Sequence, residues 1–412
     1  MSSSKFMFKT IEQHESPDST YKSSEPFIMD RAQGSLIRNP EGQEFIDLCA
    51  GFGSLPLGHS HESLRSTFSR WSQDFPPVVH GMGDVYCSRS KILLIQELLE
   101  AMPPHLSHVS LSVTGSGAVE TALKTAILHT GSHGFISLKG GYHGLDMGTL
   151  PVTDWPKFKN PFNLTGPIEA SHVPIGASKE SLHQVIQELE RGPGFAGIIM
   201  EPIQGRAGMN VVPQDWLTEV RNICQEAGGL VILDEIFCGL GRAGLASFST
   251  ITPADIIVLG KALGGGFPIS ACLATAEVMN SWPKNSGEAI HTGTFFGHPL
   301  SCLIGYETLK VIRSENLITR SRDLGQESKA YLQAGLGTHT KVDIKGQGLF
   351  MNLDFKTPGM GPQIMKALLK KGVMALASGA YGEGLSITPA LNIPKDLLFN
   401  SLDKVLSTVQ EC

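Results

Sequence analysis

Residues 230–244 read LVILDEIFCGLGRAG, and residues 255–266 read DIIVLGKALGGG. In each stretch a nearly continuous apolar run leads into charged residues, and glycines follow shortly after them. Apolar runs of this kind are typical of strands that helices cover on both faces, as in parallel sheets. The two stretches therefore predict buried strands of an α/β domain.

The chain around these stretches alternates between helical and extended patterns. Further strands are expected at 108–114, 134–140 and 197–201, and helices at 91–102 and 118–131. This alternation predicts a large α/β domain with a mostly parallel central sheet. After about residue 306 the pattern changes to helices around a short strand set, which predicts a second, smaller α+β domain.

The expected domain organisation has three parts. Residues 1–65 hold a polar, Ser-rich stretch that is interpreted as a loose or partner-docked arm, followed by a β-hairpin that contributes to the small domain. Residues 66–305 are expected to form the large domain, and residues 306–412 the small one.

Composition excludes several classes of function. The net charge is −6 and the chain has no Lys/Arg block, so neither a nucleic acid nor a membrane surface is an expected partner. The seven cysteines are scattered and form no C-x-x-C pair, so we expect free thiols in a reducing compartment and no metal site. No apolar run reaches the roughly 18 residues of a membrane span, and the N-terminus has no signal-peptide core. The expected location is the cytoplasm.

Three predicted strands lead into charged side chains: Glu201, Asp234 with Glu235, and Lys261. In open α/β sheets, ligands bind outside the carboxyl ends of the strands. Any one of these residues could simply mark the point where a buried strand reaches water. Asp234 and Lys261 together, each followed by a glycine-rich loop that lets the backbone approach a bulky ligand, favour a functional site.

A second candidate element is the run Thr114-Gly115-Ser116-Gly117, between a predicted strand and a predicted helix. Free N–H groups and the helix dipole at such a place favour a phosphate. The run lacks the third glycine of a dinucleotide fingerprint and the G-K-[ST] of a nucleotide P-loop. In isolation it would be interpreted as a tight turn.

These residues belong to a set of motifs that resembles the class III aminotransferases over nearly the whole chain, from about 25 to 397. The matching stretches, in the order and spacing of that family, are EGQEFIDLCAGFGSLPLGHSH (41–61), TGSGAVETALK (114–124), GYHG (141–144), EPIQG (201–205), DEIFCGLGRAG (234–244), LGKALGGGFPISA (259–271), TFFGHP (294–299) and GQGLFM (346–351). The resemblance implies fold type I of the enzymes that use pyridoxal phosphate (PLP), and PLP as the cofactor.

The resemblance also implies roles for single residues. Lys261 would form a Schiff base with PLP and later shuttle the proton at the substrate Cα. Asp234 would pair with the pyridine nitrogen and keep it protonated. Gly115 and Ser116 would hold the phosphate. Thr294 matches the residue that reaches the phosphate from the neighbouring subunit, which implies a homodimer.

Three more side chains near these motifs receive weaker assignments. Tyr142 would stack on the pyridine ring, although it could also be an ordinary buried tyrosine at a strand end. Glu201 would support the residues that touch the cofactor. The adjacent His143 has no role that the sequence defines.

The departures from the family pattern concern the substrate. Many relatives have Arg where this chain has Leu145. Many also have Glu where this chain has Arg206, and an Arg that pairs with that Glu where this chain has Ser386. Phe237 replaces a usual Gln. If position 386 kept its Arg, Arg206 would face a second positive charge with no carboxylate to pair with either. The replacement of that Arg by Ser386 removes this repulsion and leaves Arg206 as the single cation of this pair. Arg206 is therefore the candidate for binding a substrate carboxylate, with a solvated loop arginine as the alternative.

The expected function is a PLP-dependent aminotransferase that moves an amino group between an amino donor and a keto acid or aldehyde. A PLP-dependent amino-acid epimerase or aminomutase on the same scaffold is the alternative. Phe52, in the CAGFGS loop, could line the substrate pocket or belong to the core. The sequence names neither donor nor acceptor.

Overall fold

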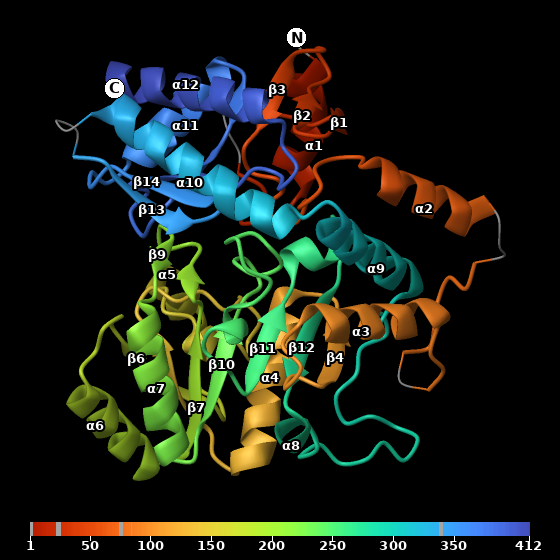
Figure 1. Cartoon of the computed structure of the whole chain (residues 1–412), viewed down its shortest axis with the longest axis vertical. Helices are drawn as coiled ribbons and strands as arrows, with labels where there is room; N and C mark the ends of the chain where they lie inside the picture. The colour runs from red at the N-terminus through yellow and green to blue at the C-terminus, as the bar shows by residue number, and fades with distance from the viewer. Residues whose placement is uncertain (1–2, 22–25, 74–76, 84, 338–340) are drawn as a thin grey trace.

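The computed structural model describes residues 3–21, 26–73, 77–83, 85–337 and 341–412. Figure 1 shows two stacked bodies: a central sheet with its helices below, and the C-terminal elements together with the N-terminal strands above. Both chain ends lie in the upper body. Among the described residues, no helix combines the length and apolar content that a membrane crossing requires.

The lower body is built on a seven-stranded sheet with the order β4-β12-β11-β10-β7-β5-β6. Its strands are β4 (His108–Ser112), β5 (Gly134–Leu138), β6 (Glu169–Val173), β7 (Phe195–Met200), β10 (Leu230–Asp234), β11 (Ile256–Leu259) and β12 (Ser270–Ala274). The pairs on either side of β10 are parallel, whereas β12 runs antiparallel to both of its neighbours. The prediction of an α/β fold with a mostly parallel sheet is confirmed.

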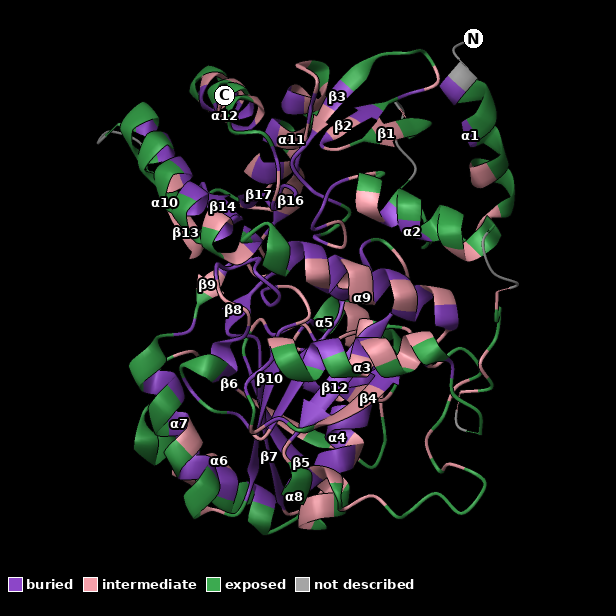
Figure 2. Cartoon of the chain, turned by 45° about the vertical axis from the view of Figure 1, so that its right-hand side comes forward, coloured by how far each residue is buried: buried purple, intermediate pink, exposed green. Residues whose placement is uncertain are grey.

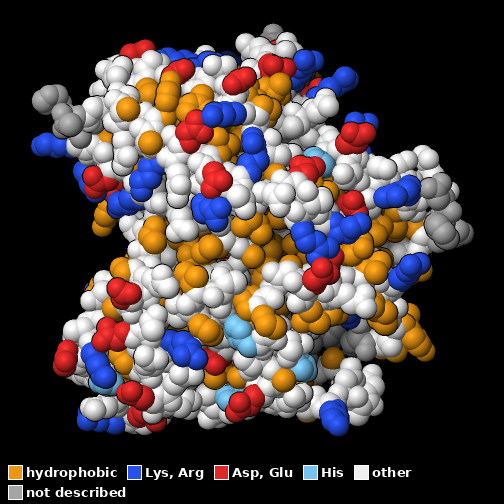
Figure 3. All heavy atoms as spheres, viewed as in Figure 1, with side chains coloured by type: hydrophobic (Ala, Val, Ile, Leu, Met, Phe, Trp, Pro, Cys, Tyr) orange, Lys and Arg blue, Asp and Glu red, His pale blue; other side chains and the backbone are white. Residues whose placement is uncertain are grey.

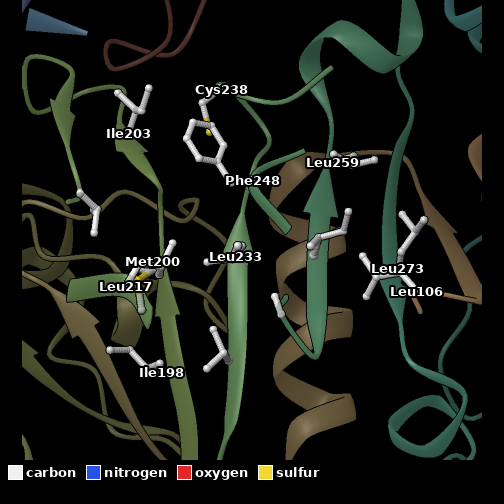
Figure 4. Packing of buried hydrophobic residues seen from close by; sticks show 14 of the residues in the cluster. Leu106, Ile198, Met200, Ile203, Leu217, Leu233, Cys238, Phe248, Leu259 and Leu273 are labelled. Atoms are coloured by element: carbon white, nitrogen blue, oxygen red, sulfur yellow. The ribbon is translucent and has the colours of Figure 1, made fainter. Parts of the chain in front are cut away.

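Alternate residues of each strand face opposite helical layers. On β10, Val231 and Leu233 join a core with α6 (Lys179–Glu190) and α7 (Gln214–Glu226), whereas Ile232 packs with α4 (Gly115–Thr130) on the other face. Figure 4 shows side chains of the first core on adjacent strands, and Figure 2 shows the strands almost wholly buried. This two-sided burial is the physical reason for the continuous apolar runs.

The strands end where the polar motifs begin. β10 ends at Asp234, and β11 ends at Leu259, so that Lys261 opens a single 3-10 turn (Lys261–Gly264) beyond the strand. Helix α4 begins at Gly115, earlier than expected, because Thr114 caps it: the Thr114 hydroxyl accepts a hydrogen bond from Gly117 N at 3.0 Å. The helix ends at Gly131 in the left-handed conformation, as predicted.

The upper body has its own core around a second sheet with the order β13-β14-β17-β16. Its elements are β13 (Asp343–Gln347), β14 (Phe350–Asp354), β16 (Leu376–Ser378), β17 (Gly384–Ile387), α10 (Leu317–Leu336), α11 (Met360–Lys370) and α12 (Lys395–Glu411). The predicted N-terminal hairpin is present as β2 (Leu36–Arg38) and β3 (Glu44–Asp47), with β1 (Arg31–Gln33) at its side. Strand β15 (Val373–Met374) pairs with β3.

The boundary expected between residues 305 and 306 falls within helix α9 (Pro299–Ser314), which packs on α2 (Glu62–Gln73) and on α3 (Arg89–Ala101). The proposed division into domains at 65/66 and 305/306 stays a proposal.

The N-terminal stretch differs from the expected loose arm. Residues Ser3–His14 form helix α1, and the backbone N–H and hydroxyl of Ser4 donate to the Glu41 carboxylate at 2.9 and 2.8 Å. Phe8, one helical turn further on, is buried. The expectation of a loose conformation was wrong for the described part of this stretch, because the Ser4 hydrogen bonds and the buried Phe8 side chain dock helix α1 on the rest of the chain. Docking of this arm on a partner stays a prediction.

Candidate active site

A cavity of about 900 Å³ lies at the carboxyl ends of β7, β10 and β11, with walls from both bodies. It brings together seven of the eight predicted site residues: Phe52, Gly115, Ser116, Tyr142, Arg206, Asp234 and Lys261. The same cavity is also lined by three residues that differ from the usual family pattern, Leu145, Phe237 and Ser386.

Lys261 presents its amine at the floor of the cavity. Its backbone is left-handed, with φ of 26°, which turns the chain sharply after the strand. The Nζ atom lies 4.3 Å from the centre of the Phe237 ring. Loss of solvation lowers the pKa of Lys261, and the charges of Asp234 and Glu201 oppose this effect. The amine is therefore easier to deprotonate than that of a solvated lysine.

The Phe237 ring beside this amine is tightly packed by its neighbours. It packs against Phe350 with ring centres 4.6 Å apart. A Cβ atom at Gly53 or Gly205 would lie 2.7 or 2.6 Å from the ring, so only glycine fits at these two positions. The replacement of the usual Gln therefore makes this side of the amine apolar.

Asp234 is held by a neighbour for which the sequence defined no role. His143 Nδ1 lies 2.7 Å from Asp234 Oδ2, and both side chains are buried. Asp234 Oδ1 accepts a hydrogen bond from Ile236 N at 3.1 Å. A contact this short between an imidazole nitrogen and a carboxylate places a proton on Nδ1, donated to Asp234. His143 thus fixes the carboxylate that faces the cavity.

Glu201 organises the backbone on one side of the cavity. Its carboxylate accepts hydrogen bonds from Tyr142 N and Gly205 N, both at 2.9 Å. Burial raises the pKa of Glu201 to about 7. These two contacts hold the loops that carry Tyr142 and Arg206, as expected for a supporting residue.

The N-terminus of α4 closes another side. A Cβ atom at Gly115 would lie 3.0 Å from the Ile236 side chain, so the glycine lets the first residue of α4 pack closely against Ile236, which also lines the cavity. The Ser116 hydroxyl donates to Asp146 Oδ2 at 2.6 Å. Asp146 also lines the cavity, and no motif in the sequence had pointed to it.

Arg206 is exposed and stands against three aromatic rings. Its Cζ atom lies 5.1 Å from the ring centre of Tyr142, 5.6 Å from that of Trp155 and 5.0 Å from that of Phe158. Within the described residues, no carboxylate comes within the 4.0 Å of an ion pair with Arg206. No motif had pointed to Trp155 or Phe158.

The family model described as aminotransferase class III matches residues 19–409. This chain belongs to the class III aminotransferases. The resemblance seen in the motifs is thereby confirmed, and with it the PLP-dependent transaminase function of the chain.

Curated relatives and a solved structure agree with this assignment. The aminotransferase is 31% identical to the acetylornithine aminotransferase of Methanosarcina acetivorans over 81% of this chain and 80% of that one. It is 30% identical to the 5-aminovalerate aminotransferase of Pseudomonas aeruginosa over 94% of this chain and 93% of the other. An ornithine aminotransferase of Toxoplasma gondii, described with partial occupancy of PLP at its active site, shares the fold with a TM-score of 0.85 and 24% identity, covering 98% of this chain and 94% of that one. The alternative of an epimerase or aminomutase is not favoured.

The side chains at the cavity of this aminotransferase fit PLP. A half-buried amine with a lowered pKa, a fixed carboxylate and a capped helix N-terminus match the aldehyde, the pyridine nitrogen and the phosphate of the cofactor. Thr294 is the predicted residue that lies outside the cavity of its own chain. It is exposed, and its carbonyl accepts a hydrogen bond from His80 Nε2 at 2.6 Å.

Proposed function

We propose that this aminotransferase transfers an amino group between a carboxylate-bearing amino donor and a keto acid or aldehyde, with Lys261 and Asp234 as its catalytic residues. The observation that supports this proposal best is the placement of the Lys261 amine and the His143-fixed Asp234 carboxylate in one cavity. PLP, when bound, supplies an electrophilic carbon and a ring that accepts electrons. The side chains of the cavity position the reactants and move the proton.

Lys261 has the properties of the proton carrier in this scheme. An amine with a lowered pKa could accept the proton of the substrate Cα and deliver it to the electrophilic carbon that PLP would supply. The apolar ring of Phe237 beside Nζ offers no competing hydrogen bond. We assign to Asp234 the retention of a proton on the pyridine nitrogen, and to His143 the orientation of Asp234.

We assign the substrate carboxylate to Arg206. The positions of Leu145 and Ser386, where many relatives carry arginine, line the same cavity and leave it with the cations Arg206, Lys157 and Lys261. A guanidinium offers two parallel donors to a carboxylate, which neither Gln nor Lys reproduces.

The experiment that tests the function and this assignment follows the absorbance of the bound cofactor when an amino donor is added without an acceptor. We expect stoichiometric conversion to the aminated cofactor and release of a keto product. For donors with a carboxylate, the Arg206→Gln variant should need about 10- to 100-fold more donor, because one charged hydrogen-bonded contact contributes about 1.5–3 kcal/mol. Simple amines without a carboxylate should show a much smaller change.

Other results would overturn one part or the other. Inversion of the donor's configuration without release of a keto product would identify the epimerase alternative. Equal losses for both donor types would assign Arg206 to structure, and no loss for either would leave it a solvated loop arginine.

We also propose that the active unit is a homodimer, with Thr294 reaching the phosphate of the partner's site. The loop that carries Thr294 exposes Ile290 and Phe295, and the adjoining segment 77–83 exposes Val78, Val79 and Met82. Figure 3 shows hydrophobic side chains gathered on the right-hand side, near α3 and α9. Exposed apolar surface of this kind marks interaction sites.

A mixed dimer tests this arrangement. Lys261→Ala and Thr294→Ala chains are each expected to be impaired as homodimers. When the two are unfolded together and reassembled, about half of the sites in each mixed dimer should be intact, because the unaltered Lys261 of one chain meets the unaltered Thr294 of the other. Recovered activity supports the proposal, whereas the absence of recovery in verified mixed dimers would show that Thr294 does not act across the interface.

A location in the cytoplasm is the last element of the proposal. It is supported by the seven cysteines, which are all free and of which five are buried. Cell fractionation with an antibody to the chain would test it.

A further inference from the structure

The segment Trp155–Phe158 brings two aromatic rings and a second cation to Arg206. A single turn of helix, α5 (Pro156–Lys159), places both Trp155 and Phe158 against the guanidinium. Lys157, between them, lines the same cavity. Its Nζ atom lies 4.9 Å from the centre of the Phe158 ring and 5.5 Å from that of Trp155. Arg206 and Lys157 therefore share the same two rings.

Burial, hydrogen bonds and ring contacts fix the positions of Trp155 and Phe158. Trp155 is buried, and its indole N–H donates to Gly140 O at 3.1 Å. Phe158 N donates to Trp155 O at 2.9 Å, and the Phe158 ring meets that of Tyr142 edge-on with centres 6.1 Å apart. A guanidinium stacked on fixed rings loses fewer conformations when it binds a carboxylate than a free arginine would.

Arg206 and Lys157 give this part of the cavity a local positive charge that would favour the binding of an anion. Two cations beside the same rings repel each other, and within the described residues neither Arg206 nor Lys157 has a carboxylate at ion-pair distance. A bound carboxylate would relieve this repulsion and satisfy the guanidinium donors. Lys157 contributes a positive point charge to the site, whereas the planar guanidinium of Arg206 also fixes the orientation of the bound carboxylate.

We infer that the segment Trp155–Phe158 determines the specificity of this enzyme for anionic substrates: Trp155 and Phe158 are positioning residues for Arg206, and Lys157 is the second cation of the same carboxylate subsite. The inference rests on the proposed role of Arg206. It extends that role to two rings that act on the substrate through Arg206, and to a second cation at the same rings. The ligand that it predicts is a carboxylate group of the amino donor or of the keto acid.

The test uses the PLP-loaded enzyme and measures kcat and KM with a carboxylate-bearing donor and with a neutral amine. Phe158→Ala should raise KM for the carboxylate donor about three- to tenfold, the range expected when an arginine loses an aromatic neighbour, and should leave the kcat for that donor nearly as it was. Phe158→Tyr should restore KM, since the ring is retained. Lys157→Gln should raise the same KM about two- to fivefold and weaken its dependence on salt.

An equilibrium measurement complements the kinetics. Propionate, which cannot react, is titrated against the bound cofactor's absorbance to give its dissociation constant for each variant. Phe162→Ala and Lys179→Gln, exposed side chains outside the cavity, are the matched controls and should behave as the unaltered enzyme.

The outcomes separate this inference from the proposed function. If Arg206→Gln weakens carboxylate binding while Phe158→Ala and Lys157→Gln match their controls, the segment has no such role although the assignment of Arg206 stands. If Arg206→Gln has no effect, the proposed carboxylate site fails and the inference fails with it. Equal effects of Phe158→Ala on carboxylate and amine donors would show a general loss of structure and would also overturn the inference.

Discussion

Replacement of Lys261 by alanine is expected to abolish turnover while the protein stays folded. We expect kcat to fall at least about ten-thousand-fold, equivalent to about 5 kcal/mol of barrier, because the amine that shares the cavity with Asp234 at the strand ends is lost. Within the described residues the side chain makes no ion pair at 4.0 Å or less, so its removal breaks no direct charge pair and the fold should survive. Steady-state kinetics and thermal unfolding of the same preparation measure both effects.

Chemical mapping provides the independent check. Borohydride reduction of the PLP-loaded enzyme, followed by peptide analysis, should place the pyridoxyl group on Lys261. Lys179→Ala, an exposed lysine on α6, serves as the control and should retain full activity. A pyridoxyl group on a different lysine, or appreciable turnover by Lys261→Ala, would refute the central assignment.

The second large effect is expected at Asp234. Asp234→Asn should still bind PLP but lose about a hundred- to ten-thousand-fold in kcat, because a neutral amide cannot keep a proton on the pyridine nitrogen. The amide oxygen can still accept the His143 Nδ1 proton, so the pair that fixes the residue should survive the substitution. Kinetics and a PLP titration of the same variant distinguish a loss of rate from a loss of cofactor.

Asp255→Asn is the matched control for this experiment. Asp255 precedes β11, and its carboxylate accepts the backbone N–H of Val231 at 2.8 Å, at the end of the strands opposite to the cavity. We expect this substitution to lower thermal stability without changing kcat. If Asp234→Asn retained more than about a tenth of the activity, the deficit would be only about 1.4 kcal/mol, too small for the role assigned here.

Much of the fold follows from the sequence because its signals are local. The apolar runs of β7, β10 and β11, the glycine that ends α4 and the turn of the β2–β3 hairpin each act within a few residues. The carboxyl ends of parallel strands meet at one edge, so Lys261 and Asp234 could be predicted to lie close together. The cavity contains both.

The remaining features depend on contacts between distant residues. His143 meets Asp234, and Trp155 meets Arg206, only after the sheet has formed, and no spacing in the sequence encodes either contact. The antiparallel direction of β12 could not be predicted from the sequence either. All of its residues are buried, and a strand buried on both faces has the same apolar pattern whether it is parallel or antiparallel.

The left-handed backbone of Lys261 has a consequence for the evolution and engineering of this enzyme. A non-glycine residue in that conformation costs roughly 1–2 kcal/mol, which glycine would largely recover. A variant selected only for heat resistance would therefore gain from Lys261→Gly and lose the amine. Stability and chemistry are opposed at this single position, so design for thermostability should keep residue 261 fixed and search elsewhere in the chain.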